Sequence, residues 1–380
     1  MKAQLTRKLR GRIRAALVLE DGTVFDGYSF GATKSTTGEA VFSTSMVGYP
    51  EALTDPSYRG QVLCLTYPLI GNYGVPSYEE RTENVPVFFE SESIQSRGLV
   101  VHELCETPSH RLSVRTLDKW LLEEDIPGIC GIDTRRLARI LRERGVMLSA
   151  IATGDDIGSI DVASIQDPNK VDLVKQVSTR KPITYGGESE NKVVLIDCGV
   201  KSSIIRNLRQ RDVAVIRVPY DTSTSEILDY GAVGVVVSNG PGDPKICKQT
   251  IQTIRDLIDA AVPVLGICLG TQLIALAAGA DTYKMKYGHR SQNQPVVDTE
   301  TNRCYITTQN HGFAVDRPSL EKAELKVWFV NANDQSIEGL KHAEKPCWGV
   351  QWHPEASPGP TDTEFIFDFF LKEANRYATI

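Results

Sequence analysis

The chain has 380 residues, of which 41% are hydrophobic and 24% are charged, a composition typical of a globular protein rather than a disordered one. Its length exceeds an ordinary domain of about 100–200 residues and predicts two domains. A net charge of −6 indicates neither a nucleic-acid nor a membrane surface, so no partner of either kind is expected. The longest apolar run, near 273–280, is far below the ~18 residues that a membrane span needs.

The eight cysteines are scattered along the chain and form no CxxC pair. This pattern favours neither a zinc site nor a redox motif, so we predict no metal and eight free thiols in a reduced, cytoplasmic protein. At the N-terminus a basic stretch precedes an apolar segment, 15–19, that is too short for a signal-peptide core of ~7–15 residues. A solvated basic arm is the favoured interpretation, with a transit peptide or a docking arm as alternatives.

The first half of the chain has a mixed pattern of strand and helix signals. Asp21-Gly22 lies between apolar runs and predicts a β-hairpin. Strands are expected at 40–43 and 61–66, and helices at 112–124 and 134–144. We assign residues 1–153 to an N-terminal mixed α/β domain and the polar, glycine-containing residues 154–190 to a linker.

From Lys192 the pattern alternates between strand and helix. The expected strands are 193–196, 213–218, 233–237 and 263–267, and the expected helices are 203–211, 223–230, 246–260 and 271–278. Later strands are expected at 303–307, 326–330 and 347–351, before a final helix around Phe365 to Phe370. This alternation predicts a doubly wound, mostly parallel sheet in residues 191–380, with functional residues beyond the carboxyl ends of its strands.

Gly266-Ile267-Cys268-Leu269-Gly270 follows a buried strand and opens a helix, which is the arrangement of a nucleophile elbow with cysteine in place of serine. Glycines permit the sharp turn, and the start of a helix stabilises a thiolate. The backbone NH of Leu269 can face a developing oxyanion. A small buried cysteine in an ordinary turn is the alternative interpretation of these five residues alone.

Gly128-Ile129-Cys130-Gly131 is similar to this motif but lacks its context. Pro127 precedes it, no buried strand leads into it, and Ile132 stands in the place of the second glycine. Cys130 is therefore expected to be structural.

A cysteine nucleophile requires a base and an acid that orients the base. Gln351-Trp352-His353-Pro354-Glu355 supplies both at the end of an expected strand. Alternation along an extended segment places His353 and Glu355 on one side, and the proline keeps His353 extended. A His-Pro-Glu sequence alone is weak evidence, but with the elbow it predicts the triad Cys268, His353 and Glu355.

A second glycine turn, Ser238-Asn-Gly240-Pro-Gly242-Asp-Pro244, follows the third strand of this half. Its glycines allow backbone NH groups to approach a substrate carbonyl, although a plain surface turn is the alternative. The turn fits neither GxGxxG nor GxxxxGK[ST], so no ATP site is expected in this chain.

Together, the Ser-Asn-Gly-Pro-Gly-Asp-Pro, Gly-Ile-Cys-Leu-Gly-Thr-Gln and Gln-Trp-His-Pro-Glu motifs resemble the class I glutamine amidotransferases over about residues 191–372. The first half narrows the resemblance to the small, glutaminase subunits of carbamoyl phosphate synthetase. The stretches that carry it begin at Val41 (VFSTSMVGY), Leu53 (LTDPSY), Leu65 (LTYPLIGNYG) and Gly131 (GIDTR), and Asn310 begins a fitting NHGFAV.

The resemblance implies that Cys268 attacks the glutamine amide to give a thioester and ammonia, that His353 transfers protons, and that Glu355 orients His353. It further implies a set of positions that hold glutamine: Ser45, Gly240, Gly242, Leu269, Gln272, Asn310, Gly312 and Phe313. Ser45 has no independent signal, because a polar loop residue is its ordinary interpretation.

The resemblance also implies a large synthetase subunit as partner, in a heterodimer or higher oligomer, with ATP and Mg²⁺ bound there. Whether the product serves pyrimidines, arginine or both stays open. The chain departs from the family pattern at Thr271, where His is frequent, and at 290–294, which are less glycine- and histidine-rich. His289 and His311 are expected to stabilise loops.

Three other functions each fit only part of the sequence. A cysteine hydrolase such as a γ-glutamyl peptidase would share the elbow but not the 238–244 turn or the first half. A regulatory subunit with a dead site conflicts with the intact triad. Amidotransferases of anthranilate, GMP or CTP synthesis fit the second half only.

Overall fold

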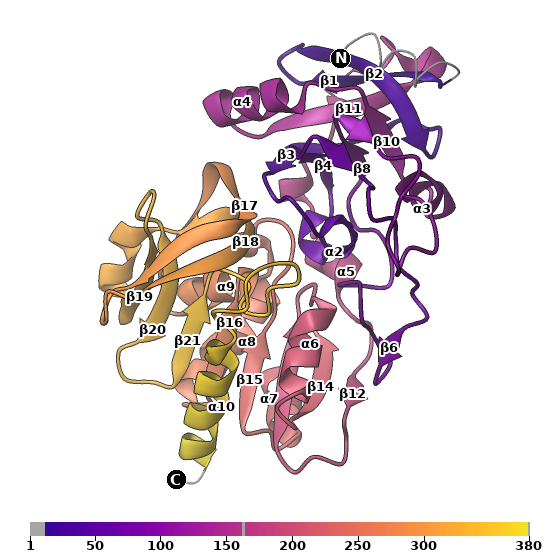
Figure 1. Ribbon diagram of the computed structural model, residues 1–380. Coiled ribbons are helices and arrows are strands. Elements are labelled where there is room, and N and C mark those ends of the chain that lie inside the picture. Colours follow the sequence, from indigo (N-terminus) through magenta and orange to yellow (C-terminus); the bar gives the residue numbers. More distant parts are fainter. Residues whose placement is uncertain (1–11, 162–163, 379–380) are drawn as a thin grey trace. The chain divides into compact units, whose positions relative to one another are not determined.

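The computed structural model describes residues 12–161 and 164–378, so residues 1–11 of the basic N-terminal arm lie outside the described residues (Figure 1). The last two basic residues of that stretch are not a free arm, because Arg12 pairs with Glu106 and Arg14 opens the first strand. The chain divides into two compact units. The first comprises residues 1–80 and 88–170, and the second comprises 81–87 and 171–380. Each unit has its own hydrophobic core.

The first unit is built on a closed barrel with the strand order β1-β11-β3-β4-β8-β10-β2. Its strands are β1 (Arg14–Leu19), β2 (Val24–Gly31), β3 (Thr36–Ser43), β4 (Gln61–Leu65), β8 (Gly98–Val100), β10 (Pro127–Cys130) and β11 (Met147–Thr153). Strands β3, β4, β8 and β10 run parallel to their neighbours within this group, and the remaining pairs are antiparallel. The unit also contains α2 (Tyr49–Thr54), α3 (Leu117–Glu123), α4 (Thr134–Arg144), β5 (Leu69–Ile70) and β9 (Glu103–Leu104).

Local sequence signals in this unit act largely as expected. Gly22 has the positive φ of 82° that the β1–β2 turn requires. Helix α4 has the expected bounds because the Asp133 side chain accepts a hydrogen bond from Arg136 N at 2.9 Å. It ends at Gly145 and buries Leu137 and Leu141 in the barrel core.

The expected helix 112–124 is shorter in the structure. Helix α3 begins only after Thr116, whose side chain accepts from Lys119 N at 3.2 Å. The preceding residues are extended because Val114 N and Arg115 O pair with the backbone of Val75. This pairing across the chain overrides the local helical pattern.

The second unit contains a ten-stranded sheet with the order β12-β14-β13-β15-β16-β21-β20-β19-β17-β18. Its strands are β12 (Ile183–Tyr185), β13 (Lys192–Asp197), β14 (Ala214–Pro219), β15 (Gly234–Val237), β16 (Val264–Ile267), β17 (Thr282–Asp298), β18 (Cys304–Val315), β19 (Leu325–Asn331), β20 (Ile337–His342) and β21 (Cys347–Val350). The run from β14 to β21 is parallel, as expected, and antiparallel strands extend it at both edges. A small hairpin, β6 (Arg81–Thr82) and β7 (Val85–Pro86), belongs to the same unit.

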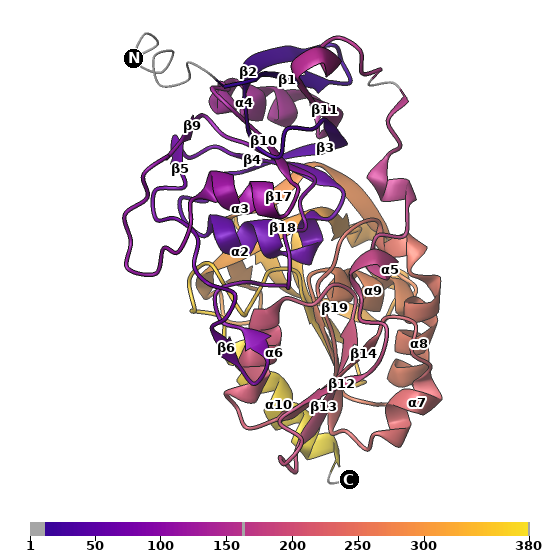
Figure 2. The same cartoon turned by 90° about the vertical axis from the view of Figure 1, so that its right-hand side faces the viewer.

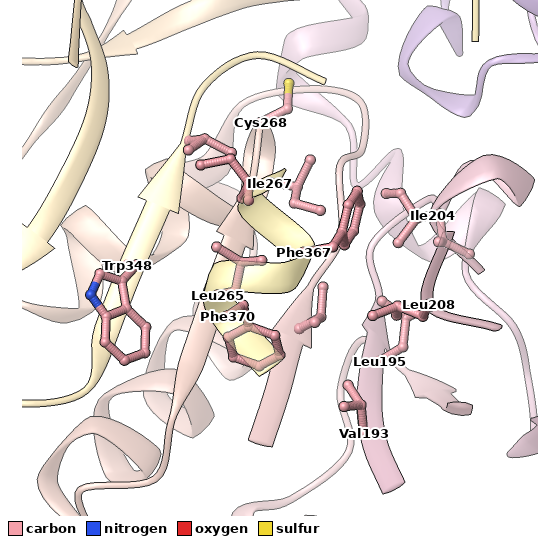
Figure 3. Close-up of a cluster of buried hydrophobic side chains, with 14 of the residues drawn as sticks. Val193, Leu195, Ile204, Leu208, Leu265, Ile267, Cys268, Trp348, Phe367 and Phe370 are labelled. Carbon is pink, nitrogen blue, oxygen red and sulfur yellow. The ribbon is translucent and has the colours of Figure 1, made fainter. Parts of the chain in front are cut away.

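Helices cover both faces of the parallel part, as a doubly wound sheet requires (Figure 2). These helices are α5 (Val174–Val177), α6 (Ser202–Arg209), α7 (Thr224–Asp229), α8 (Lys248–Asp259), α9 (Leu269–Ala277) and α10 (Phe365–Ala378). Helices α6 and α10 share one core cluster with the sheet, while α7, α8 and α9 share another. Figure 3 shows the first cluster, with Leu265 and Ile267 of β16 leading to Cys268 at its end. No helix among the described residues has the length and apolar character to cross a membrane.

Candidate active site

The elbow at Cys268 joins β16 directly to α9. Cys268 is the N-cap of α9 and has a φ of 54°, a backbone conformation that residues other than glycine rarely adopt. A Cβ on Gly266 would lie 2.5 Å from the backbone carbon of Gly270, and one on Gly270 would overlap the Val237 carbonyl oxygen. Both glycines are therefore required by close backbone packing, and the turn presents the cysteine at the carboxyl end of β16.

The Cys268 thiol is buried among backbone and amide groups. Its Sγ lies 3.7 Å from the carbonyl oxygen of Asn310, and Gln351 Nε2 approaches Sγ to 3.6 Å. The Thr271 hydroxyl donates to Val350 O at 2.6 Å and fastens the start of α9 to β21. The departure from the family pattern at Thr271 thus contributes a bond that fixes the elbow.

The predicted base and acid are in contact. His353 Nδ1 donates to Glu355 Oε1 at 2.7 Å, and His353 N donates to Thr308 O at 2.9 Å. Burial acts to lower the pKa of His353, but the Glu355 carboxylate outweighs it and the pKa is raised to about 10. His353 therefore carries a proton at neutral pH. Its Nε2 is buried and forms no hydrogen bond to a described residue.

The Glu355 carboxylate is held by a buried lysine that the sequence did not single out. Lys201 Nζ lies 3.1 Å from Glu355 Oε1 and donates to Ala356 O at 2.7 Å. Burial acts to raise the pKa of Glu355, but Lys201 and His353 lower it to about 2. The turn that carries Lys201 is shaped by Asp197, whose Oδ1 accepts from Gly199 N and Val200 N. The only feature of the sequence that could have pointed to Lys201 is its position just beyond the end of β13.

Most of the predicted glutamine-holding positions lie on α9 and β18, the two elements that contact each other beside the elbow. Gln272 Nε2 donates to Phe313 O at 2.9 Å and to Gln351 Oε1 at 3.1 Å, so α9 is tied to β18 and to the segment after β21. Asn310 and Gly312 lie on β18 rather than on the expected loop, because that strand extends to Val315. Gln351, which contacts both Gln272 and Cys268, was not predicted.

The 238–244 turn also reaches the elbow. A Cβ on Gly240 would overlap the Cys198 carbonyl oxygen and lie 2.8 Å from Leu269 Cδ2, so this glycine permits the turn to pack against the residue after the thiol. Gly242 has a φ of 88°. The turn is anchored by Ser238, whose hydroxyl accepts from Cys198 N at 2.9 Å. The backbone of Gly240 is thereby fixed beside Leu269, while Gly242 packs against Leu173.

Arg290 is a buried cation that the sequence marks only as a departure from the family pattern. It pairs in register with Asn310, and Nη1 donates to Tyr287 O at 2.8 Å. Its Nη2 would lie 3.2 Å from a Cβ on Gly312, so the guanidinium lies over the segment 310–312. Arg290 therefore supports the strand that carries two of the predicted substrate contacts.

The expectation that His289 and His311 stabilise loops is wrong about their location, because they lie opposite each other on the paired strands β17 and β18. His289 Nε2 pairs with Asp334 Oδ2 at 3.0 Å, and although burial opposes it, this pairing raises the pKa of His289 to about 9. Burial lowers the pKa of His311, whose Nδ1 donates to Phe313 O at 2.9 Å. One ligand atom from each histidine and a Glu338 oxygen lie within 4.8 Å of one another. His289 Nδ1 is 3.4 Å from Glu338 Oε1 and forms no hydrogen bond to a described residue.

Ser45 belongs to the first unit. It lies beyond β3, and its hydroxyl and backbone NH both contact Ser43 Oγ, at 3.0 and 3.2 Å. These contacts fix the loop that follows β3 but do not identify a ligand, so the role of Ser45 stays a prediction. All eight cysteines are free, as predicted; Cys304 is exposed and Cys105 is half-buried.

A cysteine at an elbow, a protonated histidine and a carboxylate that orients it form a triad suited to acyl transfer. The class of protein with this triad on a doubly wound sheet is the class I glutamine amidotransferases, and residues 194–373 match the model of that family. Residues 17–151 match the carbamoyl-phosphate synthase small chain, CPSase domain.

Relatives extend this match along nearly the whole chain. The carbamoyl phosphate synthase small chain of Methanopyrus kandleri is 48% identical over 94% of this chain and 98% of its own length. The arginine-specific small chain of Aspergillus fumigatus is 45% identical over 96% of this chain and 80% of its own. The chain therefore belongs to the carbamoyl phosphate synthase small chains, the glutamine amidotransferase subunits of that enzyme.

Proposed function

We propose that this chain hydrolyses glutamine through a thioester on Cys268 and delivers the ammonia to a large, ATP-dependent chain that makes carbamoyl phosphate from bicarbonate. The observation that carries the proposal is the triad, in which His353 Nδ1 lies 2.7 Å from Glu355 beside the elbow thiol. ATP and Mg²⁺ are expected on the large chain, consistent with the absence of a phosphate-binding motif from this sequence.

In the first step Cys268 has passed its thiol proton to His353, and the resulting thiolate sulfur bonds to the side-chain carbonyl carbon of glutamine. The carbon–nitrogen bond then breaks, and the departing nitrogen takes the proton of His353 and leaves as ammonia. Backbone NH groups of Leu269 and Gly240 would stabilise the oxyanion between these events, a role supported by the packing of Gly240 against Leu269. A histidine whose pKa is raised to about 10 holds the required proton at neutral pH.

In the second step water attacks the thioester carbon while His353 accepts a proton from it. The carbon–sulfur bond breaks, glutamate leaves, and the thiolate and protonated histidine are restored. Glu355 keeps the imidazole oriented in both steps, and Lys201 keeps Glu355 ionised.

The thioester is tested by quenching the protein with acid during turnover of labelled glutamine. We expect label bound to Cys268 that neutral hydroxylamine releases, and none on Cys268→Ser. Delivery is tested by adding the large chain with ATP and bicarbonate, which should yield carbamoyl phosphate and a faster glutaminase. Carbamoyl phosphate from the isolated small chain would contradict the subunit assignment.

A further inference from the structure

The first unit carries a groove that the glutaminase chemistry does not use. It has a volume of about 620 Å³ and lies between helix α4 and the segments that follow β3 and β4. One wall is polar and cationic, and the other is largely apolar. Its lining residues are Phe42, Thr44, Met46, Thr66, Tyr67, Pro68, Arg135, Ala138, Arg139 and Arg142.

The cationic wall is a stripe of three arginines on α4. Arg135, Arg139 and Arg142 stand at positions i, i+4 and i+7, so they share one helix face, opposite the buried Leu137 and Leu141. All three are exposed, and within residues 12–161 and 164–378 none of their guanidiniums forms an ion pair or hydrogen bond.

Other arginines of the same helix are compensated inside the protein. Arg144 pairs with Asp21, and Arg136 lies 5.1 Å from the ring centre of Phe25. Like charges spaced by three or four residues repel each other by a few tenths of a kcal/mol per pair. An uncompensated stripe of this kind is suited to carboxylates supplied from outside the chain.

The apolar wall exposes large hydrophobic side chains to solvent, which is energetically unfavourable. Met46 is 65% exposed and Tyr67 36% exposed, and Phe42 and Ala138 line the floor between them and the arginines. Large exposed apolar groups rimmed by charge are characteristic of protein interaction sites, where aromatic, methionine and arginine side chains are enriched.

The groove is built only from the part of the chain that distinguishes synthase small chains. Every lining residue lies within 17–151, the range of the small-chain model, and none lies within 194–373, the range shared with other class I amidotransferases. Three stretches that carry the first-half resemblance border it, at 41–49, 65–74 and 131–135.

From these observations, and resting on the proposed function, we propose that this groove docks the large chain. Its occupant is a segment of the large chain that presents carboxylates toward Arg135, Arg139 and Arg142 and one or two apolar side chains toward Met46 and Tyr67. The carboxylates set the register and speed association, while the apolar contacts supply most of the affinity.

The experiment measures binding of this chain to the purified large chain, whose ammonia-dependent synthesis of carbamoyl phosphate verifies that it is native. We expect Arg139→Glu to weaken binding roughly tenfold and the triple variant Arg135→Glu/Arg139→Glu/Arg142→Glu by about 100-fold or more. The triple glutamine variant, which places no acid near the C-terminus of α4, should show a similar loss. Tyr67→Ser should weaken binding severalfold without changing its dependence on salt.

Arg111→Glu is the matched control, because Arg111 is an exposed arginine of the same unit outside the groove. It should bind within twofold of wild type. Raising the salt concentration should weaken wild-type binding and leave the triple variant nearly unaffected. Glutaminase activity without the large chain should be the same in every variant.

Binding of either triple variant within twofold of wild type would overturn the docking site. So would a wild-type chain that does not bind the large chain at all, or a triple variant that loses only self-association in light scattering. The proposed chemistry is tested separately. If it is wrong, the isolated wild-type chain will show no glutaminase activity, and the binding pattern described here can still hold.

Discussion

The tripeptide Gly-Ile-Cys stands at the end of a buried strand in both units of the protein, so the expectation that no buried strand leads to Cys130 is wrong. In the first unit the three residues complete β10, and Cys130 Sγ donates to Tyr28 O at 3.4 Å within the barrel. Burial raises the pKa of Cys130 to about 11, which keeps it a neutral thiol. In the second unit they lead from β16 into α9, and Cys268 has a φ of 54° at the helix start.

The difference lies in the residues after each cysteine and in the neighbouring strand. Gly131 comes after Cys130 and α4 begins only at Thr134, whereas α9 begins immediately after Cys268. Each cysteine strand has a parallel neighbour that leads toward a histidine, β8 toward His102 and β21 toward His353. His102 donates to Ile132 O, while His353 pairs with a carboxylate. A reactive thiol therefore depends on the turn and its partners rather than on the tripeptide.

The largest expected contrast is between serine substitutions of the two thiols. Cys268→Ser should lower glutaminase activity by about 10³-fold or more, because a serine hydroxyl is not ionised at a helix start. Cys130→Ser should leave activity near wild type, because serine can keep the hydrogen bond to Tyr28. Ammonia release measures the first effect and thermal unfolding verifies that both proteins fold. Equal activities would remove Cys268 as the nucleophile.

The two histidines should differ nearly as strongly. His353→Asn removes the group that transfers protons and should lower activity by about 10²–10⁴-fold. His102→Asn should affect only the loop at Ile132 and leave kcat unchanged. Steady-state glutaminase kinetics of both variants test this, and a comparable loss of kcat in the two would contradict the assignment of His353.

Glu355→Gln should be less damaging than loss of the base, because the carboxylate orients the base without moving protons. Without that charge the pKa of His353 falls from about 10, so the alkaline limb of the pH–rate profile should move to lower pH. The pair also stabilises the folded protein in a pH-dependent way. The lowered pKa of Glu355, about 2, adds to the free energy of unfolding in full above pH 4.5, whereas the raised pKa of His353 adds to it in full below pH 6.5.

The free energy of unfolding should therefore differ most between wild type and Glu355→Gln from about pH 4.5 to 6.5. The difference should shrink toward pH 10, as His353 loses its proton, and toward pH 2, as Glu355 gains one. Denaturant titrations across this range measure it. A pH–rate profile of the variant that matches wild type in level and shape would exclude Glu355 from the triad.

Alanine in place of the first glycine of each tripeptide should separate stability from catalysis. A Cβ on Gly128 would lie 2.5 Å from the Phe30 ring, and one on Gly266 would meet the backbone of Gly270 and Thr271 at 2.5–2.6 Å. Each change should destabilise the protein by about 1–3 kcal/mol. Only Gly266→Ala should also lower kcat, because it moves the elbow; an equal effect on kcat at both sites would contradict this.

The order of alkylation gives the finest comparison. In brief treatment with iodoacetamide we expect Cys268 to react first, the exposed Cys304 next, and Cys130 last among these three. Mass spectrometry of the labelled peptides measures the order. Labelling of Cys130 as fast as Cys268 would mean that the two turns present similar thiols, and labelling led by Cys198 or Cys247 would count against the assigned environment of Cys268.

The elbow could be predicted from the sequence because its determinants are local: an apolar strand, two glycines and a helical run. The same holds for the hairpin at Gly22 and for α4 with its Asp133 cap. Of the ladder β17–β18, the sequence predicted only the start of β18, at 303–307. Strand β17 carries the polar residues 284–294, without strict alternation, and is defined by its pairing with β18 and β19.

Contacts between charged or polar side chains far apart in the sequence also could not be predicted. Lys201 resembles an ordinary surface residue in the sequence, and only folding brings its ammonium against Glu355, 3.1 Å away. Gln351 could have been noticed because it adjoins the His353 motif, but its contact with the thiol joins residues 83 positions apart along the chain. Such partners depend on which strands become neighbours, and local patterns do not encode that choice.

The place of β16 in the sheet affects how the chain can be synthesised. Strand β16 lies between β15 and β21, so until residues 347–350 have been synthesised it has no partner on one side. An apolar strand with an open edge invites pairing with another chain, so a ribosome-bound or truncated product ending before β21 should be a client for chaperones. Because His353 and Glu355 follow β21 directly, the proposed triad is completed only after β16 has gained its second partner.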